Sequence, residues 1–265
     1  MLKNLTLLGL LFSTSMTFAD ALTSIKLFDA KVYTLKNKGM KDIVVDIVST
    51  KLNQQINNQG TFGNVNNLIF RVYWTLVPER FDIEVLGLPE GFRELKEELK
   101  ISVSSLVENI LPPPTDKKFS TYKFSELPNN QFKAQDTSGV ADIPTFLLKF
   151  DAQNRLVEII GQKPVGSFVV SPVYEKDSFS DGKWVLKKQV TKAQENGQDV
   201  TSVKTIIYGT QNGVTVPKGV TISTDQTFSR PEMKPVSFTE TIEFKNYKLN
   251  TGEAMKHFMK DAPVP

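Results

Sequence analysis

The second half of the chain limits the possible folds most, because almost all of residues 119–247 is predicted to form β-strands. Apolar and polar side chains alternate there in short runs, as they do in strands with one buried face. Turn sequences such as Asn196-Gly197 and Asn212-Gly213 separate the runs, and no crossover helix is predicted between them. Strands joined by turns pair in the antiparallel direction. We therefore expect a long antiparallel sheet that curls into an open or closed barrel.

The first half of the chain adds a helix, a strand and a hairpin to this sheet. Apolar residues recur every three to four positions over residues 21–35, which predicts an amphipathic helix. The period changes to two over 42–56, which predicts a strand, and the Asn- and Gly-rich segment 57–66 is predicted to be a loop. Residues 67–76 and 80–86 both alternate strictly, so they are predicted to form an antiparallel hairpin with an aromatic and apolar face.

Two further amphipathic helices are predicted, and both are available to cover the apolar face of the curled sheet. The first begins at Pro89 and ends before the three prolines 112–114, because proline cannot donate the hydrogen bond that a helix interior needs. The second spans residues 253–259. The apolar stripe of the first helix consists of Phe92, Leu95, Leu99, Val103, Leu106 and Ile110.

Residues 1–19 have the features of a secretory signal peptide. Lys3 precedes a short apolar run that ends in small residues, with Ala19-Asp20-Ala21 as the cleavage region. We expect cleavage after Ala19 or after Ala21, a periplasmic location, and a single domain over residues 20–265. The chain has no cysteine, so it has neither a disulfide nor the residue that lipoprotein acylation requires.

No residue pattern points to catalysis, to a metal or to a cofactor. The chain has a single histidine, His257, which argues against a catalytic triad. Because the chain also lacks cysteine, a transition-metal site is not expected. The chain contains no G-x-S-x-G sequence, no P-loop and no dinucleotide-binding motif. Its formal charge of +3 gives little reason to expect nucleic acid as a partner. We therefore expect a protein that is not an enzyme, with no catalytic residue, no metal site and no cofactor.

Phenylalanine is unusually frequent, with 18 residues beside 2 Trp and 6 Tyr. Many of them occupy alternating positions of the predicted strands: Phe70, Phe81, Phe146, Phe150, Phe238 and Phe244. Two interpretations are open. These rings pack an ordinary core, or they line a cavity for an apolar ligand, because a wide curled sheet cannot fill its own interior.

Four segments, taken together, resemble a known family. They are the exported N-terminus with its helix and the Lys38-Gly39 turn, the segment Tyr73-Trp74-x-x-x-Pro78-x-Arg80-Phe81, the hairpin of residues 146–151 and 156–159, and the closing strand 243–250. In this order they resemble the periplasmic carriers that sort lipoproteins to the outer membrane, the LolA/LolB-like family. The spacing from Trp to Pro is one residue longer than in that family, and the segment 89–114 is additional.

The resemblance implies a mainly β (α+β) fold, an unclosed and strongly curved antiparallel β-barrel whose apolar concave face is covered by amphipathic helices. It implies a carrier that shelters lipid acyl chains or lipid-modified proteins during outer-membrane lipoprotein sorting. Its partners would be those acyl chains and membrane-bound donor and acceptor proteins, and the carrier would be a monomer. The alternative is a regulatory module on the same fold that binds a protein partner or another apolar ligand.

For a carrier, the expected cavity lining comes from the first hairpin, the helix after Pro89 and the strand near residue 146. These residues are Phe70, Val72, Trp74, Phe81, Ile83, Val85, Phe92, Leu95, Leu99, Phe146 and Phe150. Arg80 matches the arginine that helps to hold the lid in the smaller carriers. The alternative for Arg80 is an ordinary surface residue at the start of a strand.

Overall fold

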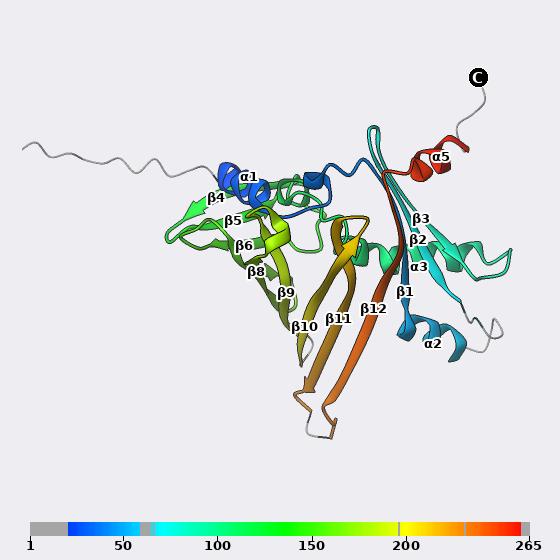
Figure 1. Cartoon of the computed structure of the whole chain (residues 1–265). Helices are drawn as coiled ribbons and strands as arrows, with labels where there is room; N and C mark the ends of the chain where they lie inside the picture. Colours follow the sequence, from blue (N-terminus) through cyan, green and yellow to red (C-terminus); the bar gives the residue numbers. More distant parts are fainter. Residues whose placement is uncertain (1–20, 59–64, 66, 196, 231, 261–265) are drawn as a thin grey trace, which may run out of the picture.

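Twelve antiparallel strands form one sheet in this computed structural model, which describes residues 21–58, 65, 67–195, 197–230 and 232–260 (Figure 1). The strands are β1 (Asp42–Ser49), β2 (Ile69–Leu76), β3 (Glu79–Leu86), β4 (Tyr122–Leu127), β5 (Gln131–Asp136), β6 (Thr145–Phe150), β7 (Leu156–Gln162), β8 (Ser167–Lys176), β9 (Trp184–Glu195), β10 (Gln198–Gln211), β11 (Val214–Phe228) and β12 (Val236–Leu249). The expected mainly β, α+β architecture with an antiparallel sheet is therefore confirmed.

Almost every strand lies beside its neighbour in the sequence. The order across the sheet is β3-β2-β1-β12-β11-β10-β9-β8-β7-β6-β5-β4, so β1 and β12 are the one neighbouring pair that a long stretch of chain separates. Short turns join most of the others. At Asn212 (φ 50°) and Gly213 (φ 75°) the turn between β10 and β11 has the left-handed backbone that a two-residue hairpin loop requires.

The sheet is open, and it is less curved than expected. Its edge strands, β3 and β4, lie at opposite ends of the strand order and do not pair with each other. The sheet is neither closed nor strongly curled, so the expected strongly curved barrel is wrong. The physical reason is that helices cover much of the apolar face, and the sheet need not roll up to bury it.

Five α-helices accompany the sheet in the described part of the chain: α1 (Ala21–Lys31), α2 (Thr50–Asn58), α3 (Arg93–Val107), α4 (Thr115–Lys118) and α5 (Glu253–Lys260). The predicted helices over 21–35, after Pro89 and over 253–259 are therefore present, although α1 ends earlier and α3 begins later than expected. No helix among the described residues is long and apolar enough to span a membrane.

The strand predicted over 42–56 is only half correct. It ends at Ser49, and α2 follows it directly. The hydroxyl of Ser49 accepts a hydrogen bond from the amide of Leu52 (3.1 Å), which satisfies a donor in the first turn of this helix. The predicted signal peptide 1–19 and most of the predicted loop 57–66 lie outside the described residues.

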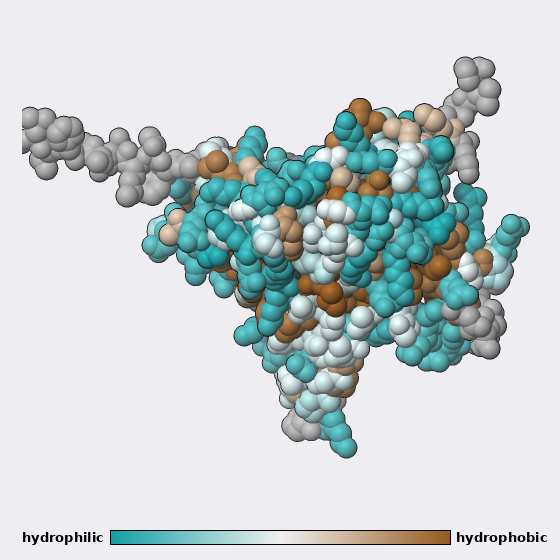
Figure 2. Space-filling model, viewed as in Figure 1, coloured by the Kyte–Doolittle hydropathy of each residue, from teal (hydrophilic) through white to brown (hydrophobic). Residues whose placement is uncertain are grey.

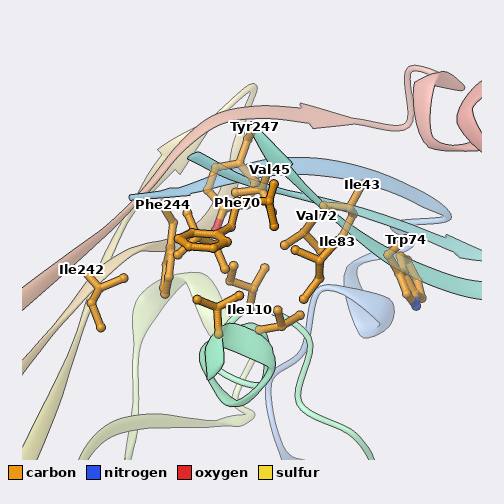
Figure 3. Packing of buried hydrophobic residues seen from close by; sticks show 14 of the residues in the cluster. Ile43, Val45, Phe70, Val72, Trp74, Ile83, Ile110, Ile242, Phe244 and Tyr247 are labelled. Atoms are coloured by element: carbon orange, nitrogen blue, oxygen red, sulfur yellow. The ribbon is translucent and has the colours of Figure 1, made fainter. Parts of the chain in front are cut away.

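The larger core cluster fills the space between α3 and the strands β1, β2, β3 and β12, and it continues to buried residues of β10 and β11. Figure 3 shows Phe70, Val72 and Ile83 pointing from the sheet toward α3 and the turn after it that carries Ile110. Phe70 and Val72 have no exposed surface. We call the face of the sheet that α3 covers the inner face, and this half of it is filled by packed side chains.

A second core cluster lies under α1, near the other edge of the sheet. Ile25 and Phe28 of α1 pack there with residues of β5, β6 and β7. The ring of Phe28 meets Phe150 (6.0 Å between centroids) and Tyr174 (5.3 Å) edge to face. The buried residues of this cluster are Ala21, Ile25, Phe28, Phe119, Phe132, Ala134, Leu148, Phe150 and Leu156.

A buried carboxylate stabilises the pairing of β1 with β12. Asp46 on β1 is 1% exposed. It accepts hydrogen bonds from Nε (2.7 Å) and Nη2 (3.1 Å) of Arg71 on β2, and from Nδ2 (2.9 Å) of Asn246 on β12. Asn246 (φ 54°) lies at a bulge in which β12 has one residue more than β1. Asp46 therefore connects three strands.

Replacing Asp46 with alanine is expected to lower the free energy of unfolding by about 3 kcal/mol, because Arg71 and Asn246 lose their shared acceptor inside the sheet. Urea unfolding followed by circular dichroism measures this loss. The control Glu195→Gln breaks the exposed Lys163–Glu195 ion pair (3.1 Å), which is expected to cost less than about 1 kcal/mol. Equal losses in the two variants would contradict the role given to Asp46.

Candidate functional site

A cavity of about 620 Å³ lies between α1, the proline segment 112–114, α4 and the strands β4 and β6–β10. The inner face of the sheet forms its floor, with Phe146 from β6, Leu156 and Ile159 from β7, Phe168, Val170, Pro172 and Tyr174 from β8, Leu186 and Gln189 from β9, and Lys204 from β10. The distance from β10 to β6 is four strand spacings, about 19 Å. The cavity therefore crosses five neighbouring strands, and it also extends along β8 from Phe168 to Tyr174.

Aromatic rings form the end of the cavity near β4 and β6. Phe146 meets Phe119 (5.1 Å between centroids), Tyr122 (5.4 Å) and Phe168 (6.1 Å) at steep angles between the ring planes. Such edge-to-face contacts fix the positions of the rings. Phe146, Tyr122 and Phe168 are nevertheless only half-buried, because each of them borders the cavity.

Asp29 joins two of the segments that cover the cavity. Its carboxylate, near the end of α1, accepts hydrogen bonds from the amide (2.7 Å) and the hydroxyl (2.6 Å) of Thr115, the first residue after the proline segment. Burial raises the pKa of Asp29, and the hydrogen bonds from Thr115 partly offset this rise. Asp29 thus ties α1 to the segment that follows the prolines.

The end of the cavity at β10 is polar. Lys204 lies on the same face of β10 as Ile206 and Tyr208, and its side chain is half-buried. Burial lowers the pKa of the Lys204 ammonium; the charge of Lys118 lowers it further, and Glu108 acts in the opposite direction. Lys118 and Glu108 pair with each other at 2.6 Å.

The structure separates the lining residues expected from the sequence. Phe146 borders the 620 Å³ cavity, and Phe150 is buried in the second core cluster. Trp74, Arg80 and Phe81 instead line a smaller cavity of about 310 Å³, which also borders the proline segment. Both cavities therefore border the proline segment, but their other lining residues come from different strands of the sheet.

The remaining expected residues lie beneath or beside α3. Phe70, Val72, Ile83, Val85 and Leu99 belong to the larger core cluster, and Leu95 packs against it. Ile83 and Val85 also border a third cavity, of about 360 Å³, whose other lining residues are mostly charged. Phe92 is half-buried immediately before α3.

Arg80 is exposed, and it contacts the C-terminal helix. Its Nη1 donates to the backbone carbonyl of Phe258 in α5 at 3.5 Å. α5 lies against β1 and β2, on the face opposite to α3, where the ring of His257 stacks on Tyr73 (3.7 Å between centroids). Nε2 of His257 is 2.8 Å from a carboxylate oxygen of Asp82. These contacts explain His257 as a residue that docks α5.

Sequence reasoning missed most of the cavity floor. The pattern near residue 168 predicts a strand but not that its apolar residues face open space. Lys204, Ile206 and Tyr208 occupy every second position in this part of β10, so they share one face of the strand. Lys204 is the charged residue on that otherwise apolar face. That signal is hidden, because Val203 and Ile207 make the other face of the same strand equally apolar.

The described residues contain no group of three or more metal-ligating side chains. On the face drawn in Figure 2 the surface is mostly hydrophilic, and its hydrophobic residues form small separate groups. The 620 Å³ cavity is therefore the best candidate for a functional site, and its volume lies within the range of about 300–1,000 Å³ that is common for ligand sites.

Replacing Asp29 with alanine is expected to loosen the cover, because the amide of Thr115 loses its acceptor. Hydrogen exchange at the Thr115 amide should become at least about tenfold faster, equivalent to about 1.4 kcal/mol of local stability. Asp136→Ala serves as the control, because it removes a similar bond to the amide of Gly139 (2.7 Å) in an exposed turn. Unchanged exchange at Thr115 in Asp29→Ala would show that Asp29 does not hold the cover.

Comparison with known proteins does not place the chain in a group: no family model, no curated protein and no solved structure matches it. The shape and the chemistry of the cavity are therefore the basis on which its function can be inferred.

Proposed function

We propose that the protein is a non-enzymatic carrier that shelters a long acyl chain in the cavity beneath α1. The observation that carries this proposal is the form of the cavity, which is about 620 Å³ in volume, crosses five neighbouring strands from β6 to β10 and is mostly apolar on its floor. A compact ligand would leave much of this length empty. An extended hydrocarbon chain would follow it.

Burial of the hydrocarbon chain would be the main source of binding free energy. Each CH₂ group removed from water contributes about 0.8 kcal/mol, so ten such groups contribute roughly 8 kcal/mol. Before the costs of association are subtracted, that corresponds to a dissociation constant of about 1 μM. A carrier must also release its cargo, and a cover held in part by the Asp29–Thr115 hydrogen bonds supports that requirement.

The biological setting in this proposal comes from the sequence resemblance. The LolA/LolB-like carriers shelter acyl chains between an unclosed sheet and helices, and the open sheet of this chain with its partly helix-covered inner face supports the comparison. A periplasmic location, membrane-bound donor and acceptor proteins, and outer-membrane lipoproteins as cargo belong to the same proposal.

A second interpretation is a regulatory module that binds a protein partner. One observation favours it: α3 and its apolar stripe fill half of the inner face, so that half has a packed core where the sequence suggested a cavity. In that case the purified protein would hold no lipid, and a partner would bind equally well when the 620 Å³ cavity is blocked.

Val170 and Val173 lie on the same strand, but Val170 borders the cavity, whereas Val173 is 40% exposed and is not part of its lining. Val170→Trp is expected to fill the middle of the cavity and to weaken binding of a neutral, fluorescent long-chain lipid probe at least about tenfold. Val173→Trp should bind the probe like the wild type.

Fluorescence titration measures both affinities, and the melting temperatures of the variants show whether each is folded. Absence of probe binding by the wild-type protein would contradict the carrier proposal. Equal binding by two folded variants would place the acyl chain outside this cavity.

A further inference from the structure

Lys204 is a cation without a partner on a mostly apolar floor. It forms no ion pair and no hydrogen bond with any residue that the structure describes. Its neighbours on the same face of β10, Ile206 and Tyr208, belong to the apolar side of the sheet. An unpaired, half-buried ammonium is unfavourable, because burial removes the water that stabilises its charge.

The other charged side chains that border the cavity already have polar partners. Lys36 pairs with Glu79, and Lys118 pairs with Glu108 at 2.6 Å. Asp29 accepts the hydrogen bonds that hold the cover. Lys204 is therefore the one charged side chain of the lining that has neither an ion pair nor a hydrogen bond among the described residues.

Polar groups gather at this end of the floor. Gln189 on β9 is the direct cross-strand neighbour of Lys204, and both side chains border the cavity. Toward β6 the floor consists of apolar and aromatic residues: Leu156, Ile159, Phe146, Phe168 and Val170. The floor thus has a cationic end and an apolar end about 19 Å apart.

This distribution is complementary to an amphiphile with one charged end. We propose that the natural ligand is an anionic amphiphile, whose carboxylate or phosphate head group binds Lys204 and Gln189 while its hydrocarbon tail lies across β9, β8 and β7 toward Phe146. This inference rests on the proposed carrier function and adds the charge and the orientation of the ligand. The anion supplies the missing counter-ion of Lys204 in a place where water is partly excluded, so their attraction is stronger than at the surface.

A set of amphiphiles with the same tail tests the inference. Hexadecanoate and hexadecyl phosphate carry an anionic head group, and hexadecanol carries a neutral one. Each is titrated into delipidated full-length protein below its aggregation concentration, with displacement of the neutral fluorescent probe as the measurement. The wild-type protein should bind the two anions at least about tenfold more tightly than the alcohol.

Lys204→Gln removes the charge with little change in length, and Lys188→Gln removes an exposed charge on β9 as the matched control. Lys204→Gln should lose the preference for anions and keep its affinity for hexadecanol within about twofold, whereas Lys188→Gln should behave like the wild type. The ratio of the two anion affinities then identifies carboxylate or phosphate as the preferred head group.

The outcomes separate this inference from the carrier proposal. If the wild-type protein binds all three amphiphiles equally, or if Lys204→Gln keeps the preference for anions, the inference is wrong and the carrier proposal stands. If the wild-type protein binds none of them, the carrier proposal itself fails.

Discussion

The path between the two edges of the sheet is the constraint on which the rest of the structure depends. β3 lies at one edge and β4 at the other, so residues 87–121 must cross the sheet. α3 has 15 residues and is about 22 Å long, whereas twelve strands at their usual spacing are about 53 Å wide. The helix can therefore fill only part of the inner face. α1, the proline segment and α4 cover the other part, and the cavity lies beneath them.

The part of the fold that could be predicted from the sequence is the part that depends on local signals. Alternation and turn residues are local signals, and they correctly predicted the β2–β3 hairpin and the antiparallel meander that follows α4. The pairing of β1 with β12 depends on distant parts of the chain: Asp46 and Asn246 meet across this pair, far apart in sequence. No local pattern encodes that meeting, and none shows that helices rather than a strongly curved sheet will cover the apolar face.

The candidate site shows the same limit. Aromatic residues such as Phe70 and Trp74 mark a face that will be buried, but alternation does not say whether a helix or a ligand covers it. The stripe of α3 covers Phe70, whereas α3 does not reach Phe146, which borders open space. The role proposed for Lys204 depends on its position in the sheet, beside Gln189 and among apolar neighbours, which the sequence alone does not show.

A crystal structure with a terminally brominated, long-chain fatty acid would locate an acyl chain in the 620 Å³ cavity, because bromine can be located by its anomalous scattering. We expect a bromine position near Phe119, Tyr122 and Phe146, with the carboxylate at Lys204. A bromine position in the smaller cavity beside Trp74, or none bound to the protein at saturating ligand, would contradict this expectation.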